Sequence, residues 1–186
     1  MQNKGHVPGE EGVWVLILGD LFVFSTFFLM FAWYRVNALP IFEAGQAVLD
    51  RTLGLINTLL LLTSSLLVAV AVHRVRTRRS GADGLLVLAI LCGLGFVGIK
   101  VLEYNDKFRS GIGFVTNDFF MLYFAFTGIH LIHVIIGLGV LAFMRHVARR
   151  PGAAETGMVA IESGASFWHL VDLLWIVLFA MFYLLR

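Results

Sequence analysis

Ionisable side chains inside long apolar runs are the residues of this 186-residue sequence that could do chemistry. A carboxylic acid held in lipid can carry a proton, and histidine is both a proton carrier and a common ligand of heme and metals. Two short patterns combine these residue types, His-x-x-His and His-x-x-Asp. The candidates are Asp20, Lys100, Glu103, His130, His133, His169 and Asp172.

Metal chemistry needs a larger set of ligands than the sequence offers. Only His130, His133 and His169 lie within apolar runs, fewer than a membrane centre combining heme and copper requires. Cys92 is the single cysteine, so neither an internal disulfide nor a copper site with two thiolates is possible. We therefore predict no metal-binding and no catalytic residue, although a bis-histidine heme stays open on count alone.

Structural roles compete with functional ones for every candidate. Lys100 and Glu103 are three residues apart, so they share a helix face and can neutralise each other. His169 and Asp172 have the same spacing, and histidines can hydrogen-bond across helices as packing contacts. Asp20 has no basic residue within a helical turn, so it needs a partner from another helix or stays protonated.

The elements that must position these residues are membrane helices. Hydrophobic residues make up 59% of the chain and charged residues only 14%, against about 25% charged residues in typical soluble proteins. A helix needs about 20 apolar residues to cross the hydrocarbon core of a bilayer. We expect an all-α integral membrane bundle forming one domain over residues 1–186, with five transmembrane helices near 13–34, 53–72, 85–104, 119–144 and 166–185.

Basic residues predict the orientation, because cytoplasmic loops carry an excess of Lys and Arg. One side of the membrane would hold eight of them and the other side five, with Lys100 inside a helix. The sequence therefore predicts a cytoplasmic N-terminus and an outer C-terminus. The eight are Lys4, Arg74, Arg76, Arg78, Arg79, Arg145, Arg149 and Arg150, and the five are Arg35, Arg51, Lys107, Arg109 and Arg186.

This orientation gives each polar residue a depth, at about 1.5 Å of rise per helical residue. Asp20 and Asp172 fall at similar depths, roughly 10 Å from the inner edge, whereas His169 is shallower and His133 is deeper, at about 16 Å. We expect these four side chains to meet in the inner half of the bundle. Glu103 should lie nearer the outer surface.

Two long motifs resemble those of cytochrome c oxidase subunit III, and the resemblance covers nearly the whole chain. Residues 167–175 read Phe-Trp-His-Leu-Val-Asp-Leu-Leu-Trp, similar to that family's Tyr-Trp-His-Phe-Val-Asp-x-x-Trp. Residues 127–137, Thr-Gly-Ile-His-Leu-Ile-His-Val-Ile-Ile-Gly, resemble its Thr-Gly-Phe-His-Gly-Leu-His-Val-x-x-Gly. Glu103, Glu162 and Trp168 also have family counterparts, whereas Asp20 replaces a membrane-embedded Glu.

The resemblance implies an accessory subunit of a respiratory heme-copper oxidase in a bacterial plasma membrane. The chain resembles the short, five-helix bacterial branch of the family. It implies that heme and copper reside in partner subunits, a catalytic subunit I and its companion, and that this chain binds phospholipid and supports proton uptake. No partnership with nucleic acid is expected. The start of the chain resembles the subunit III-like proteins of nitric oxide reductases, so that branch is the alternative.

Two further hypotheses come from the residues alone. A self-sufficient membrane cytochrome would use His130, His133 or His169 as heme ligands. A small proton-coupled transporter would use Asp20, Glu103 and Asp172, although no internal repeat of the kind common in transporters is visible. In neither the accessory nor the transporter hypothesis is the chain catalytic alone.

Overall fold

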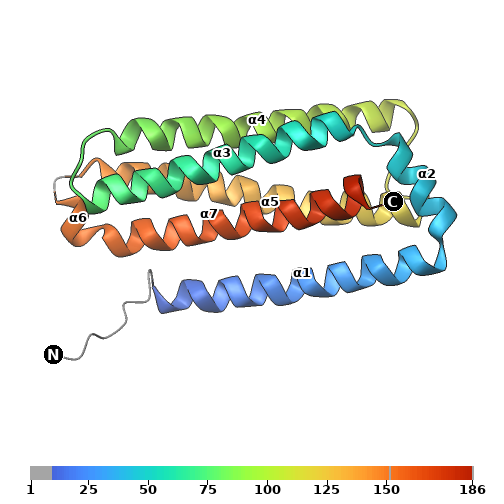
Figure 1. Ribbon diagram of the computed structural model, residues 1–186, viewed down its shortest axis with the longest axis horizontal. Helices are drawn as coiled ribbons and strands as arrows, with labels where there is room; N and C mark the ends of the chain where they lie inside the picture. The colour runs from blue at the N-terminus through green and yellow to red at the C-terminus, as the bar shows by residue number, and fades with distance from the viewer. Residues whose placement is uncertain (1–9, 151, 186) are drawn as a thin grey trace.

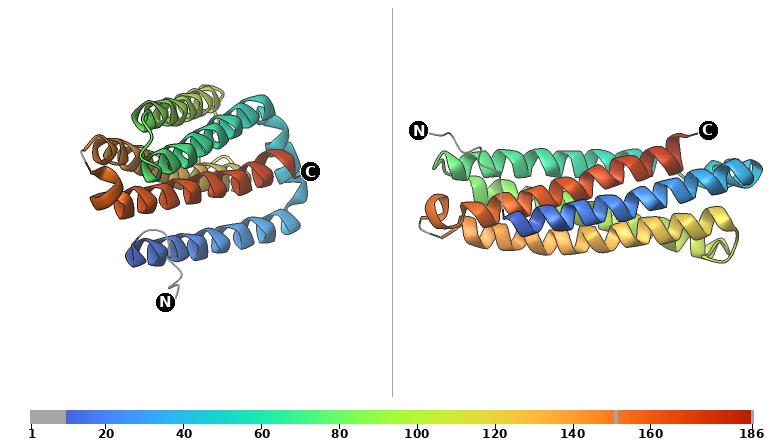
Figure 2. Two further views of the ribbon diagram at one scale, coloured as in Figure 1. Left: turned by 60° about the vertical axis from the view of Figure 1, so that its left-hand side comes forward. Right: turned by 90° about the horizontal axis from the view of Figure 1, so that it is seen from below.

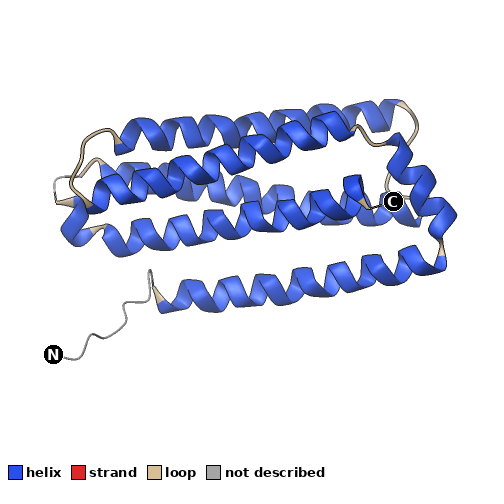
Figure 3. Cartoon of the chain, viewed as in Figure 1, coloured by secondary structure: helices blue, strands red, loops and turns tan. Residues whose placement is uncertain are grey.

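The computed structural model describes residues 10–150 and 152–185, and these residues form helices and short connections without a strand (Figures 1 and 3). Lys4 and Arg186, two of the residues used to predict orientation, lie outside the described ranges. In chain order the elements are α1 (Glu11–Asn37), α2 (Leu39–Val48), α3 (Arg51–Arg76), α4 (Ala82–Arg109), α5 (Asp118–Ala148), α6 (Ala153–Thr156), α7 (Met158–Phe179) and the π-helical turn η1 (Ala180–Leu184).

Five of these helices are long and apolar enough to cross a membrane, which confirms the predicted all-α fold with five spans. They are α1, α3, α4, α5 and α7, the last continued by η1, and each contains 26 to 31 residues. Every span but the last is extended by a few residues at both ends. The last helix begins at Met158 rather than near residue 166, and neither α2 nor α6 was predicted.

The helices divide into a compact group and one peripheral member. Helices α3, α4, α5 and α7 pack side by side, and α1 lies outside them along α7 and α5 (Figures 1 and 2). In the most apolar stretch of α7, 67% of the residues are buried inside the protein, against 17% in α1. Helix α7 is therefore the central helix, and most of the α1 surface is left for lipid or another protein.

The ends of the helices are fixed by local hydrogen bonds. The side chain of Asp50 accepts hydrogen bonds from the backbone amides of Thr52 and Leu53, at 2.8 and 3.3 Å, and so caps the start of α3. Asn117 does the same for Phe120 at the start of α5, at 2.9 Å. These caps satisfy amides that a helix start leaves without partners, so tight turns can join long helices.

Glycines allow the central helices to approach closely around one tryptophan. A methyl group on Gly137 of α5 would lie 2.6 Å from the ring of Trp168, and one on Gly93 of α4 would lie 3.1 Å from the same ring. Trp168 itself, on α7, is fully buried. Small residues are typical of close helix contacts in membranes, because there van der Waals packing replaces the hydrophobic effect.

A phenylalanine cluster holds the short helix α2 against the other elements at the end of the bundle where α1 finishes. Phe42 of α2 packs edge-on against Phe31 of α1 and Phe119 of α5, at centroid distances of 5.3 and 5.5 Å. Gln46 of α2 donates a hydrogen bond of 2.9 Å to the carbonyl of Met181. Helix α2 thereby ties α1 to the rest of the chain.

Candidate functional site

Lys100 and Glu103 form a buried ion pair on α4. The Nζ of Lys100 lies 2.9 Å from Oε2 of Glu103, and the two residues are only 1% and 3% exposed. A lone charge at the centre of a bilayer costs about 2.5–3.5 kcal/mol on insertion scales. Pairing within one helix turn leaves the two side chains together with no net charge.

Two tyrosines complete this pair. Tyr183 of η1 donates a 2.6 Å hydrogen bond to Oε1 of Glu103, and Lys100 donates to the hydroxyls of Tyr183 and Tyr123 at 3.0 and 3.2 Å. The ammonium also lies 4.9 Å from the ring centre of Trp175, a cation–π distance. We call these five residues the lysine cage. Its polar groups satisfy one another, and its tyrosines were not predicted from the sequence.

Asp20 and His133 form a second polar pair, between α1 and α5. The Nε2 of His133 lies 3.6 Å from a carboxylate oxygen of Asp20, so the partner that Asp20 requires does come from another helix. The other ring nitrogen of His133 is 2.9 Å from the carbonyl of Ile129, within its own helix. The side chains are 23% and 19% exposed, so this pair can be reached from outside the bundle.

His169 and Asp172 belong to a third polar group, on the side of α7 that faces α3. His169 lies 2.6 Å from the hydroxyl of Ser65 on α3 and 3.9 Å from the carboxylate of Asp172. Among the described residues, no hydrogen bond or ion pair joins this group to Asp20 and His133. The expected meeting of all four is therefore wrong, because His169 faces α3 while His133 faces α1.

His130 does not act as polar packing glue. It is fully buried, and neither of its ring nitrogens has a hydrogen-bond partner. Its ring instead packs between Phe96 of α4 and Trp175 of α7, at centroid distances of 5.7 and 5.4 Å. The expected hydrogen bond to another helix does not form, because the side chains packed against the imidazole from α4 and α7 are aromatic rings.

Glu162 and Trp168 lie at the start of α7 and in its interior. Arg76, from the end of α3, contacts the Glu162 carboxylate at 2.5 Å, which links the two helices near one membrane surface. A hollow of about 230 Å³ beside this pair also reaches His169. Trp168 contributes packing rather than polarity, since its buried indole nitrogen has no hydrogen-bond partner.

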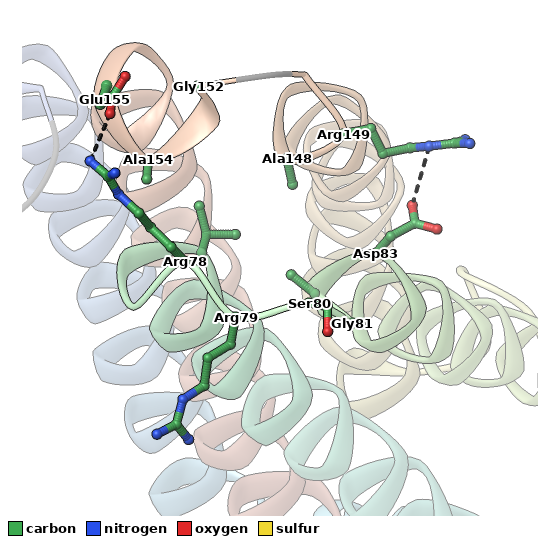
Figure 4. Close-up of a pocket in the computed structure, with 12 residues that line it drawn as sticks. Arg78, Arg79, Ser80, Gly81, Asp83, Ala148, Arg149, Gly152, Ala154 and Glu155 are labelled. Carbon is green, nitrogen blue, oxygen red and sulfur yellow. Dashed lines mark hydrogen bonds and ion pairs between the residues drawn. The ribbon is translucent and has the colours of Figure 1, made fainter.

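An arginine-rich hollow of about 600 Å³ opens at the same end of the bundle, between the α3–α4 turn and the α5–α6 turn (Figure 4). Arg78 pairs with Glu155 at 2.6 Å. Asp83 pairs with Arg145 at 2.7 Å and with Arg149 at 3.9 Å. Acidic residues thus neutralise much of the positive charge at these turns. The cytoplasmic location that this positive charge predicted stays a prediction.

The candidate residues are dispersed into pairs. Within residues 10–150 and 152–185, no three His, Cys, Asp or Glu side chains gather as a metal site would require. The geometry therefore defines a membrane protein of five spans in which the candidate acids Asp20, Glu103 and Asp172 each lie beside a Lys or His side chain.

Comparison with known proteins gives the family. The sequence model of the cytochrome c oxidase subunit III family matches residues 9–186, and the chain belongs to that family. It is 28% identical over 177 residues to cytochrome bo(3) ubiquinol oxidase subunit 3 of Pseudomonas putida, covering 94% of this chain and 84% of the relative. It is 29% identical over 181 residues to quinol oxidase subunit 3 of Bacillus subtilis, covering 94% and 85%.

Relatives named for a different electron donor are equally similar. Cytochrome c oxidase subunit 3 of Synechocystis is 28% identical over 198 residues, which cover 98% of this chain and 83% of the relative. Together with the five spans, the bacterial relatives identify a multi-pass protein of the bacterial plasma membrane.

Proposed function

We propose that this chain is the accessory subunit III of a respiratory heme-copper oxidase, packed against a catalytic subunit I that carries the heme and copper. The match of the family over residues 9–186 is the observation that carries the proposal. The arrangement of the polar residues agrees with it, because these side chains form pairs rather than a ligand set. The companion of subunit I is a further partner.

The proposed contribution of the chain is to stabilise the catalytic subunit, to bind phospholipid and to support proton uptake. Asp20 supports the last part. It is an acid in a membrane-spanning helix, 3.6 Å from a His133 ring nitrogen, and two such titratable groups side by side can pass a proton between them. The lysine cage is a structural anchor by contrast, since its charges are sealed inside the bundle.

Affinity purification tests the proposal. A tagged chain extracted from its own membrane with a mild detergent should bring down a large heme-containing polypeptide, and the preparation should consume oxygen. A tagged chain that purifies alone under these conditions would contradict the accessory role. A preparation that reduces nitric oxide rather than oxygen would place the chain in the nitric oxide reductase branch.

An optical spectrum separates the accessory role from a self-sufficient cytochrome. The chain produced without partner subunits in a host that makes heme should show no Soret band. His130 explains this expectation, because its ring is packed between Phe96 and Trp175, where a heme has no room to approach. A Soret band that His133→Gln or His169→Gln abolishes would support the cytochrome.

A further inference from the structure

A groove of about 400 Å³ runs between α1 and α7, at the end of the bundle where α1 finishes. Phe28 and Ala32 form part of its wall on α1, and Val177 of α7 and Met181 of η1 form part of the opposite wall. Its volume lies within the roughly 300–1,000 Å³ of small-molecule sites. Its lining is apolar except for one residue, Arg35.

Arg35 brings a hydrogen-bond donor into this groove without an acceptor. Its Nε is buried and has no hydrogen-bond partner. Within the described ranges, no carboxylate forms an ion pair with this arginine. A guanidinium has five N–H donors and keeps its charge, and leaving a buried donor unpaired is costly. The guanidinium of Arg35 therefore offers a positive charge and an unused donor to an anionic group that enters the groove.

The position of Arg35 along α1 indicates the depth of that anion. The residue lies in the last turn of α1, two residues before the helix ends at Asn37. Trp33, two residues earlier on α1, is 72% exposed, as expected of an aromatic anchor at the membrane surface. Arg35 is thus at the level of lipid headgroups, while the groove extends from it along apolar side chains towards the hydrocarbon.

We propose that this groove binds a glycerophospholipid, with the phosphate on Arg35 and one acyl chain between Phe28 and Val177. A guanidinium suits a phosphate because its donors match two oxygens at once. The inference rests on the phospholipid binding in the proposed function and gives it a place. That place is separate from Asp20, since the two residues are about 22 Å apart along α1 at 1.5 Å per residue.

Native mass spectrometry of the full chain in detergent tests the proposal with two added lipids. Dioleoyl phosphatidylglycerol carries the phosphate, and dioleoylglycerol has the same acyl chains without it. The wild-type chain should retain the phospholipid over the diacylglycerol, and Arg35→Gln should weaken phospholipid retention about fivefold. Arg51→Gln is the matched control, because Arg51 is exposed at the same end of the bundle and does not line the groove.

A second variant tests the acyl-chain half of the site. Ala32→Phe should fill the groove and lower retention of both lipids, whereas Leu29→Phe, on the exposed side of α1, should leave retention unchanged. If Ala32→Phe left phospholipid retention unchanged while added inorganic phosphate displaced the phospholipid, Arg35 would bind free phosphate and the proposal would fail. Arg35→Lys should keep part of the preference for the phospholipid over the diacylglycerol. This variant retains the positive charge, so it tests the proposal even if Arg35→Gln misfolds.

Purification of the assembled oxidase separates this proposal from the accessory role. Arg35→Gln should still bring down the heme-containing subunit while losing a tightly held phospholipid. If the variant kept the phospholipid but lost that subunit, a carboxylate of the partner protein would occupy Arg35, and the lipid site would be disproved. If the wild-type chain brought down no heme protein yet preferred the phospholipid, the accessory role alone would fail.

Discussion

Lys100 and Glu103 lie one helical turn apart on α4, with the ammonium 2.9 Å from the carboxylate, and both residues are buried against side chains of α5, α7 and η1. Glu103 also accepts the hydroxyl of Tyr183 at 2.6 Å, so the pair links α4 to the last turn of the chain. Replacing one member of such a buried pair lowers the stability strongly, whereas replacing both members with uncharged residues lowers it far less.

Glu103→Gln should therefore destabilise the protein strongly. It leaves the Lys100 charge buried without its counter-ion, and breaking a buried pair in this way costs about 3–5 kcal/mol. The double variant Lys100→Met with Glu103→Gln should recover much of that loss. Unfolding in mixed micelles of increasing SDS content gives the free energies of the two single variants and the double variant, and additive effects would show that the two residues are not coupled.

Tyr183→Phe should lower the unfolding free energy by about 1–3 kcal/mol, because Glu103 and Lys100 each lose a hydrogen bond to a buried hydroxyl. Tyr34→Phe is the control, since Tyr34 is half-buried and the structure gives its hydroxyl no hydrogen bond to another described residue. The same SDS titration compares them. Equal stabilities of the two variants would show that the lysine cage does not anchor η1.

Gly137→Ala and Gly139→Ala should have opposite effects, although both lie on α5. A methyl group on Gly137 meets the Trp168 ring at 2.6 Å, and overpacking of this kind costs about 1–3 kcal/mol. A methyl group on Gly139 meets nothing within 4 Å, so this variant should gain up to about 1 kcal/mol of helix propensity. Thermal stability in detergent measures both, and a stable Gly137→Ala variant would show that α5 and α7 can separate freely.

Asp20→Asn should slow turnover of the assembled oxidase more at high pH than at low pH. A carboxylate beside His133 helps to collect protons when they are scarce in the surrounding water, and the amide cannot. Oxygen consumption measured across a pH series gives the result. Asp106→Asn, which alters a carboxylate at the opposite end of the bundle, should leave the profile unchanged. Parallel profiles for Asp20→Asn and wild type would restrict Asp20 to a packing or lipid contact.

Labelling of single cysteines tests the predicted orientation. In a Cys92→Ser background, Val115→Cys should react with an impermeant maleimide added to intact cells, because Val115 is 96% exposed in the turn between α4 and α5. Arg79→Cys, in the turn between α3 and α4, should react only after the membrane is opened. The reverse pattern would place the N-terminus outside.

The five spans were predictable because each is a continuous apolar run, which has few alternatives in a bilayer. Helix α2 was not, since Leu39–Val48 is far too short to cross a membrane and contains Pro40, Glu43 and Gln46. The start of α7 was placed too late because Glu162, Ser163 and Ser166 lower the local hydropathy. The structure gives all three polar residues partners: Arg76 for Glu162, the Glu10 amide for Ser163 and the Glu162 carbonyl for Ser166.

The partners of the candidate residues were only partly predictable. Lys100 and Glu103 are neighbours by helix geometry alone, so their pairing needs no knowledge of the fold. Contacts between helices depend on how each helix is rotated about its axis, which a uniformly apolar sequence does not encode. For this reason depth alone suggested that Asp20 and His169 would meet, and the role of Tyr123 and Tyr183 was missed.

The peripheral position of α1 imposes an order on biosynthesis. This helix is translated first, but the two helices along which it lies, α5 and α7, emerge from the ribosome late. Until then α1 lacks its contacts with α5 and α7, and the carboxyl group of Asp20 lacks the His133 side chain beside which it lies in the folded protein. Its almost uninterrupted apolar sequence suits residence in lipid during that interval, and its packing against α5 and α7 must follow their insertion.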